Sequence, residues 1–200
     1  MSSRLSFSNL AKRIHAKPCA QAFRLVAIDG GAGAGKSTFA ARLARALGGA
    51  PVIQVDDFIT FLDFEHWWPR LEAEVLKPLF RGQPARYQIR DWVGDVAGPG
   101  LLNEWKTCAP APIILLEGVT SSRRVLGPRL HYAVWVEAPR DLRRARGLAR
   151  DKDVESAAAL WDRFLPGEAA FFAADKTRDR ADIRVDGTAP WNADGFGLQS

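Results

Sequence analysis

The sequence predicts an α/β fold, in which a parallel sheet of about five strands lies between layers of helices. Short apolar runs alternate along the chain with segments of helical periodicity, which is the pattern of strands joined by crossover helices. A glycine-rich segment stands directly after the first apolar run, and two later runs end in carboxylates at Asp56 and Glu117. In open parallel sheets such groups meet at the carboxyl edge, where ligands bind.

Five apolar runs are the expected strands. The most apolar are RLVAIDG and PIILLEG, and their nearly continuous hydrophobicity is typical of strands buried on both faces. Five segments are expected to be helical, and one of them places Phe39, Leu43 and Leu47 four residues apart. The strands are expected at 24–30, 51–55, 112–118, 131–138 and 181–187, and the helices at 5–16, 35–49, 67–80, 139–151 and 154–174, with the last helix broken near Pro166.

The length of 200 residues suits one domain, and we expect residues 1–200 to form it. Within it, residues 1–22 are expected to be an N-terminal helical extension and residues 140–155 a short helical lid. Residues 82–106, rich in Gly, Pro and aromatics, are expected to be a loop-dominated insert on the substrate side, with room for a short hairpin.

Composition narrows the class of partner. The net charge of +5 comes from arginines spread over many segments, which favours an enzyme of anionic small molecules over a nucleic-acid-binding protein. No apolar run approaches the roughly 20 residues of a membrane helix, and the N-terminus lacks a signal-peptide pattern. The only two cysteines, Cys19 and Cys108, form no disulfide framework and lack the spacing of a cysteine metal site, so a cytoplasmic location is predicted.

The glycine-rich segment predicts a phosphate-binding loop. Its residues match G-x-x-x-x-G-K-[ST] without a gap, between an expected strand and an expected helix. Backbone amides and the helix N-terminus can surround phosphate oxygens, Lys36 can reach the terminal phosphates, and the Ser37 hydroxyl can bind Mg²⁺. The alternative, a glycine turn that binds nothing, is disfavoured by the full spacing. This loop after the first strand predicts that the parallel sheet is of the P-loop NTPase type. The predicted nucleotide-binding residues are Gly30, Gly31, Ala32, Gly33, Ala34, Gly35, Lys36, Ser37 and Thr38.

Carboxylates are expected near this loop. The strand 51–55 returns to the carboxyl edge, so Asp56 and Asp57 are predicted to lie there and to serve a metal or accept a substrate proton. Glu117 ends the most apolar strand and is predicted to lie near Mg²⁺. The alternatives are a turn-capping Asp pair and a solvent-facing acid.

Two further groups are candidates. Arg143, Arg146 and Arg150 share one helical face and could stabilise a phosphoryl group in transfer, although a solvated basic face explains them nearly as well. Phe58, Tyr87 and Trp92, with Asp91, could bind a flat ring. The alternative is that Trp92 only fills a small core together with Trp67 and Trp68.

These segments together resemble the uridine kinase family of P-loop kinases, which neighbours phosphoribulokinase and bacterial pantothenate kinase. The similarity covers roughly residues 24–188 and is carried by IDGGAGAGKSTFA, VDDF, RDW, LLEGV, RRARGLARD and ADIRVDG. It implies that Asp56 deprotonates the acceptor hydroxyl, that Glu117 supports Mg²⁺, and that the three arginines form a lid over the phosphates.

The resemblance also implies contacts with the two substrates. Asp91 and Trp92 would touch the base or sugar of the acceptor, and the segment Asp186, Gly187 and Thr188 would lie near adenine. The residues after the acid–aromatic pair are Val93 and Gly94, where the family has a base-reading His. The match is therefore stronger for phosphoryl transfer than for recognition of uridine.

The sequence thus predicts an ATP- and Mg²⁺-dependent phosphotransferase that acts on a hydroxyl of a small molecule, with a nucleoside favoured. Neither nucleic acid nor membrane is expected as a partner, and a homo-oligomer is left open. One alternative is an ATP-dependent switch or slow ATPase without a small-molecule acceptor. Another is a nucleic-acid-binding ATPase, which only the charge suggests.

Overall fold

A computed structural model describes residues 4–60, 66–94, 100–189, 191 and 195–199. Its centre is a five-stranded, fully parallel sheet with the strand order β3-β6-β2-β7-β8. The prediction of an α/β fold with about five parallel strands is confirmed. The strands are β2 (Arg24–Asp29), β3 (Val52–Gln54), β6 (Ile113–Glu117), β7 (Leu130–Glu137) and β8 (Ile183–Asp186).

The continuous apolar runs arise because both faces of the sheet are buried. Along β6, Ile113 and Leu115 pack on one face, and Ile114 and Leu116 pack on the other. The first face is covered by α1 (Phe7–Ala16) and α2 (Lys36–Ala46). The second is covered by the continuous helical segment of α3 (Trp68–Leu71), the π-helical η2 (Glu72–Leu76) and α4 (Lys77–Phe80). Leu71, Val75 and Leu79, four residues apart in this segment, are buried there.

The insert contains the hairpin for which the sequence left room. β4 (Ala85–Arg90) and β5 (Leu101–Cys108) pair antiparallel, outside the central sheet. Ala85, Tyr87 and Cys108 pack into the core on the α3–α4 side, whereas Trp105 stays half exposed. Residues 95–99 of the insert lie outside the described residues.

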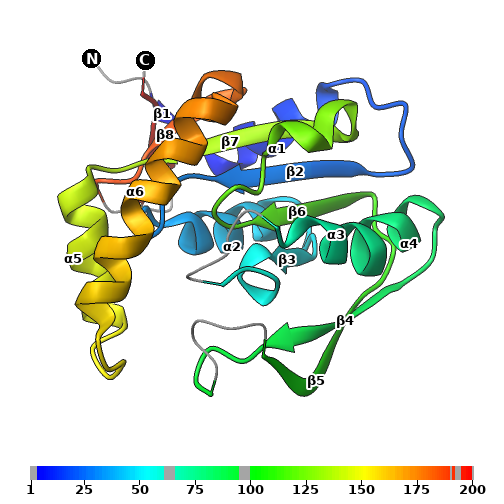
Figure 1. Ribbon diagram of the computed structural model, residues 1–200. Helices are drawn as coiled ribbons and strands as arrows, with labels where there is room; N and C mark the ends of the chain where they lie inside the picture. The colour runs from blue at the N-terminus through cyan, green and yellow to red at the C-terminus, as the bar shows by residue number, and fades with distance from the viewer. Residues whose placement is uncertain (1–3, 61–65, 95–99, 190, 192–194, 200) are drawn as a thin grey trace.

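The helix α5 (Arg140–Arg150) lies within residues 140–155, the predicted lid, and the helix α6 (Ala157–Asp175) follows this segment. Figure 1 shows them side by side at the end of the sheet where β2 and β6 terminate. The expected break near Pro166 does not occur: α6 continues through this proline. This continuity places Glu168 against the glycine-rich loop after β2, where its side chain is buried.

Short elements complete the fold. β1 (Arg4–Leu5) pairs with β9 (Phe196–Gly197), which brings the two ends of the chain together (Figure 1). Three 3₁₀ turns connect the larger elements: η1 (Val55–Asp57), η3 (Arg124–Arg129) and η4 (Arg178–Arg180). Among the described residues, no helix is both long and apolar enough to cross a lipid bilayer.

Candidate active site

The register of the sheet gathers the candidate groups at one edge. Glu117, the last residue of β6, is level with Ile28 of β2 and with Gln54 of β3. The glycine loop after β2 and the acidic turn η1 after β3 therefore begin beside Glu117. Parallel strands end at one edge, so residues about 90 positions apart along the chain share one site.

The phosphate loop runs from the end of β2 into α2. Gly35 precedes the helix with φ of 102°, a left-handed conformation that glycine adopts without strain. α2 starts at Lys36, so the first amides of the helix have no partner within it. The Lys36 ammonium donates to the Gly31 carbonyl at 3.0 Å and is largely buried. The loop thus brings a buried ammonium and unpaired helix amides to one place, and both kinds of donor suit the binding of an anion.

Ser37 and Glu117 have the chemistry of a magnesium site. The Ser37 hydroxyl donates to Glu117 Oε1 at 3.2 Å, and burial raises the pKa of Glu117 to about 7, opposed by the nearby Lys36 charge. Among the described residues, no group of three acidic, His or Cys side chains converges to hold a metal by itself. Mg²⁺ commonly takes one or two protein oxygens and completes its shell with phosphate and water, and these two residues fit that arrangement.

A pocket of about 640 Å³ opens over the loop and the acidic turn. Its walls include predicted residues from five separate segments of the chain. Apolar side chains from α6 and from the loop after β6 also line it, including Phe164, Trp161 and Val119. The predicted site residues on the pocket wall are Ala32, Gly33, Gly35, Lys36, Ser37, Thr38, Asp56, Asp57, Trp92, Glu117, Arg146 and Arg150.

The two adjacent aspartates lie in different environments. Asp57 is buried and both of its oxygens accept from Lys106 of β5, at 2.9 and 2.7 Å. Its pKa is raised by burial, an effect opposed by the bond to Lys106. Asp56 is exposed on the pocket wall, and its carbonyl accepts from the Trp92 indole at 2.9 Å. Of the pair, Asp56 is the carboxylate available to a ligand.

The aromatic and acidic residues of the insert divide between core and pocket. Trp92 lines the pocket, whereas Phe58 and Tyr87 are only 7% and 2% exposed and pack on each other with ring centroids 5.0 Å apart. The structure therefore places Phe58 and Tyr87 in the core and does not bring them to the ligand-facing wall. Asp91 accepts from the amides of Val93 and Gly94, which closes its own turn.

The three arginines of α5 have three different environments. Arg150 and Arg146 line the pocket; Arg150 pairs with Asp151, and Arg146 donates to the carbonyl of Gly187 at 2.8 Å. Arg143 is not on the pocket wall: it donates to Glu168 at 2.7 Å and to the Ala32 carbonyl at 3.1 Å. One helical face thus presents two arginines to the pocket and one to the outside of the phosphate loop.

The segment after β8 borders the phosphate loop on another side. The Gly187 amide donates to the Glu137 carbonyl, and a Cβ at position 187 would lie 2.5 Å from the carbonyl oxygen of Ala34. Only glycine therefore fits at this contact. Asp186 accepts from the amide and hydroxyl of Thr188, which lowers its pKa. These residues contact the loop and Arg146 without lining the pocket itself.

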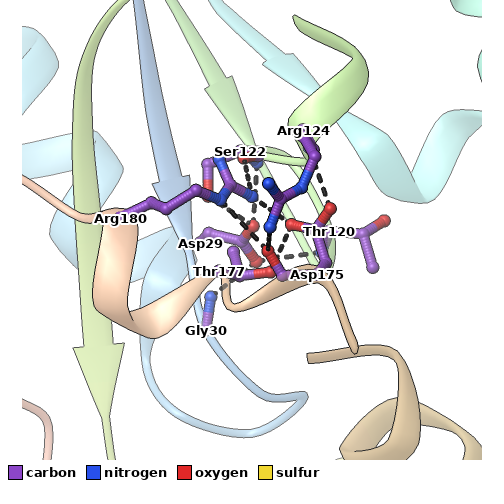
Figure 2. Close-up of polar contacts among 8 residues, drawn as sticks. All are labelled: Asp29, Gly30, Thr120, Ser122, Arg124, Asp175, Thr177 and Arg180. Atoms are coloured by element: carbon purple, nitrogen blue, oxygen red, sulfur yellow. Dashed lines mark hydrogen bonds and ion pairs between the residues drawn. The ribbon is translucent and has the colours of Figure 1, made fainter. Parts of the chain in front are cut away.

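Asp29 is a buried carboxylate that sequence analysis did not assign. It accepts from the amides of Gly30, Thr120 and Ser122 and from the Ser122 hydroxyl, at 2.7 to 2.9 Å (Figure 2). Burial raises its pKa to about 6, against the effect of these bonds. The carboxylate ties the start of the phosphate loop to the loop after Glu117. An acid at the end of an apolar strand, directly before the glycine segment, was the available signal.

A second group of polar contacts joins this loop to the end of α6. Figure 2 shows Arg124 and Arg180 meeting at Asp175, whose carboxylate also accepts from the Thr177 hydroxyl. Arg180 donates in addition to the Ser122 carbonyl at 3.1 Å. The loop that follows Glu117 is therefore fixed from two sides, by Asp29 and by the C-terminal end of α6.

Glu168 is the other residue that sequence analysis missed. Its side chain is 1% exposed, and its carboxylate accepts from the Ala32 amide at 2.5 Å and pairs with Arg143 at 2.7 Å. The expected helix break near Pro166 hid this residue, because its position depends on α6 continuing past the proline.

Comparisons with known proteins bear on the fold. No family model matches the chain, and no curated protein does. A structure described as a possible uridine kinase from Bacillus stearothermophilus has a TM-score of 0.66 and 18% identity, covering 89% of this chain and 96% of that one. A candidate fructose transport system kinase from a Silicibacter species has a TM-score of 0.58 and 20% identity, covering 86% and 94%. The chain therefore shares the fold of these two structures over nearly its whole length.

Proposed function

We propose that the chain transfers the γ-phosphoryl group of ATP to a hydroxyl of a small molecule, with a nucleoside as the acceptor. One observation carries the proposal: the exposed carboxylate of Asp56 lies on the wall of the same pocket as Lys36, Ser37 and Glu117. A phosphate-binding loop needs only the last three to hold a nucleotide. A carboxylate at the end of the neighbouring strand adds the group that an acceptor hydroxyl requires.

The donor half of the site would hold the triphosphate. The loop amides and the N-terminus of α2 bind the phosphates, and Lys36 exchanges its bond to the Gly31 carbonyl for the terminal phosphate oxygens. Ser37 and Glu117 would hold Mg²⁺, which neutralises charge on the phosphates when it is bound. Arg146 and Arg150, on the lid side of the pocket, balance negative charge on the transferred group.

The acceptor half would supply the base. Asp56 takes the proton of the acceptor hydroxyl as its oxygen bonds to the γ-phosphorus, while the bond from that phosphorus to the β–γ bridging oxygen breaks and ADP leaves. Asp57 is less suited to this step because both of its oxygens already accept from Lys106. Asp57 and Lys106 instead hold the turn that presents Asp56.

The walls around Asp56 support a neutral acceptor with a flat part. Trp92 offers its ring, and Ile59, Val119 and Phe164 add apolar surface. The two structural neighbours are described as a possible uridine kinase and a fructose transport system kinase, and uridine and fructose are both neutral compounds with hydroxyl groups. The flat ring of Trp92 favours a nucleoside over a sugar as the acceptor. However, Val93 and Gly94 stand at the positions where the uridine kinase family has a base-reading His.

The experiment is a measurement of ADP release with Mg-ATP against a panel of nucleosides, sugars, pantothenate, glycerate and sugar phosphates, with a control that lacks an acceptor. We expect stimulation by one neutral hydroxylated acceptor, above all a nucleoside. Mass spectrometry of that well should show the phosphorylated acceptor. Equal ADP release in every well, control included, would contradict the proposal and indicate an ATPase or a nucleotide-dependent switch.

A further inference from the structure

Charged side chains from α5 and α6 bind the backbone amide and the backbone carbonyl of Ala32. The Ala32 amide donates to Glu168 of α6 at 2.5 Å, and the Ala32 carbonyl accepts from Arg143 of α5 at 3.1 Å. Glu168 and Arg143 also pair with each other at 2.7 Å. Ala32, Glu168 and Arg143 therefore form a closed ring of three contacts, in which Ala32 is the third residue of the phosphate loop.

The ring is shielded from water. Glu168 is 1% exposed and Arg143 13%, so the charges meet in a medium where a broken bond is not replaced by solvent. Removing one member would leave a buried charge without its partner, which is the costly case for buried ion pairs. The orientation of the Ala32 peptide is therefore tied to the positions of α5 and α6.

Two glycines of the loop are explained by this contact. Gly31 and Gly33 stand at positions of the motif where any residue is allowed. A Cβ at Gly31 would lie 2.1 Å from Arg143 Nη1, and a Cβ at Gly33 would lie 2.3 Å from the Arg143 carbonyl oxygen. Close approach of the α5 backbone requires glycine at position 33, where φ is also +78°. At position 31 a Cβ would instead displace the Arg143 guanidinium from its place against the loop.

We propose that Glu168 and Arg143 are positioning residues that hold the phosphate loop in its triphosphate-binding conformation. Through these two side chains, the docking of α5 and α6 sets the affinity of the loop for ATP. The inference rests on the proposed function, in which this loop binds ATP. It separates Arg143 from Arg146 and Arg150: Arg143 acts on the loop from outside and does not touch the transferred group.

The chain contains a matched control. Arg144 and Asp162 join the same two helices through two hydrogen bonds, at 2.8 and 3.0 Å, but this pair is exposed. Neither residue has a described bond to the phosphate loop. Substitutions there loosen the contact between α5 and α6 without touching the Ala32 peptide.

The test compares Glu168→Gln with Asp162→Asn. Glutamine keeps the size of the side chain and an acceptor for the Ala32 amide, but it loses the charge that binds Arg143. Calorimetry measures the binding of Mg-ATP to both variants. We expect Glu168→Gln to weaken this binding at least tenfold and Asp162→Asn to change it less than twofold. With a known acceptor, KM for ATP should rise while kcat at saturating ATP stays within about twofold of wild type.

Hydrogen exchange at the Ala32 and Gly33 amides gives a readout that needs no nucleotide. Exchange there should be faster in Glu168→Gln and unchanged in Asp162→Asn. If the wild type binds no triphosphate but the exchange result holds, the proposed function fails and the positioning of the loop stands. If exchange and ATP affinity change equally in both variants, in step with thermal stability, the pair is only structural and the inference is overturned.

Gly31→Ala tests the same contact without removing a charge, should Glu168→Gln fail to fold. The added Cβ displaces the Arg143 guanidinium, so we expect weaker ATP binding in the wild-type background. In an Arg143→Gln background the same substitution should have a much smaller effect, because the contact is already lost. Additive effects of the two substitutions would contradict the inference.

Discussion

The proposed donor and acceptor halves of the pocket are built in different ways. Most of the proposed donor half is one continuous segment from Asp29 to Thr38, to which the neighbouring strand adds Glu117 and α5 adds Arg146 and Arg150. The acceptor half is assembled from η1, the β4–β5 hairpin and α6, and its residues come from far apart in the chain. The comparison teaches that a phosphate site can be encoded by local spacing, whereas an acceptor site depends on how separate segments pack.

Replacing Lys36 should break the donor half most strongly. Lys36→Ala removes the cation that the loop surrounds, and we expect ATP turnover to fall roughly 1,000-fold. Lys12→Ala, on an exposed position of α1, is the matched control and should retain activity. Undiminished turnover of Lys36→Ala would remove the assignment of the phosphate loop.

Replacing Asp56 should impair the proposed acceptor half of the pocket and leave the donor half intact. Asp56→Asn leaves the donor groups intact, so ATP binding should be preserved while transfer to the acceptor falls roughly 100-fold or more. Asp57→Asn, measured beside it, should lose less than about tenfold, because Asp57 is already bonded to Lys106. Transfer near the wild-type rate in Asp56→Asn would show that Asp56 is not the base.

The pH dependence of metal binding should sharpen the description of the donor half. Burial raises the pKa of Glu117 to about 7, so the carboxyl group is mostly protonated at pH 6 and mostly ionised at pH 8. A proton competes with Mg²⁺ for this oxygen, and Mg²⁺-dependent ATP binding should weaken about tenfold from pH 8 to pH 6.

The control for this titration is Glu117→Gln, which cannot ionise. Its Mg²⁺-dependent binding should be weaker at pH 8 and should vary less with pH than that of the wild type. Parallel pH profiles for the two proteins would argue against a role for Glu117 at the metal.

The smallest effect is expected from replacing Trp92, whose ring lines the proposed acceptor side of the pocket. Trp92→Ala should raise the KM of the acceptor about three- to tenfold through lost ring contact, with little change in the KM for ATP. Trp105→Ala, a half-exposed tryptophan on the same hairpin and outside the pocket wall, should leave both constants unchanged. Equal effects of the two substitutions would move the acceptor away from Trp92.

Sequence reasoning recovered the elements that depend on local pattern. The parallel strands, the loop between Asp29 and α2, and the meeting of Asp56 and Glu117 at one edge follow from apolar periodicity and from the direction of parallel strands. Phe58 and Tyr87 are candidates for stacking only because of their residue type and their positions after the second strand and in the insert. Because an aromatic side chain suits both a core and a ring-binding wall, only the packing decided that these two are buried.

By itself, the sequence determined the sheet, the phosphate loop and the carboxylates at its edge, because periodicity and motif spacing act over a few residues. Only the tertiary structure decided which aspartate is free, where Arg143 points and what holds Ala32. Those outcomes depend on Lys106 and Glu168, which reach their partners across 49 and 136 positions of the chain. A local pattern carries no record of such partners, since burial and hydrogen bonding select them only when the helices dock.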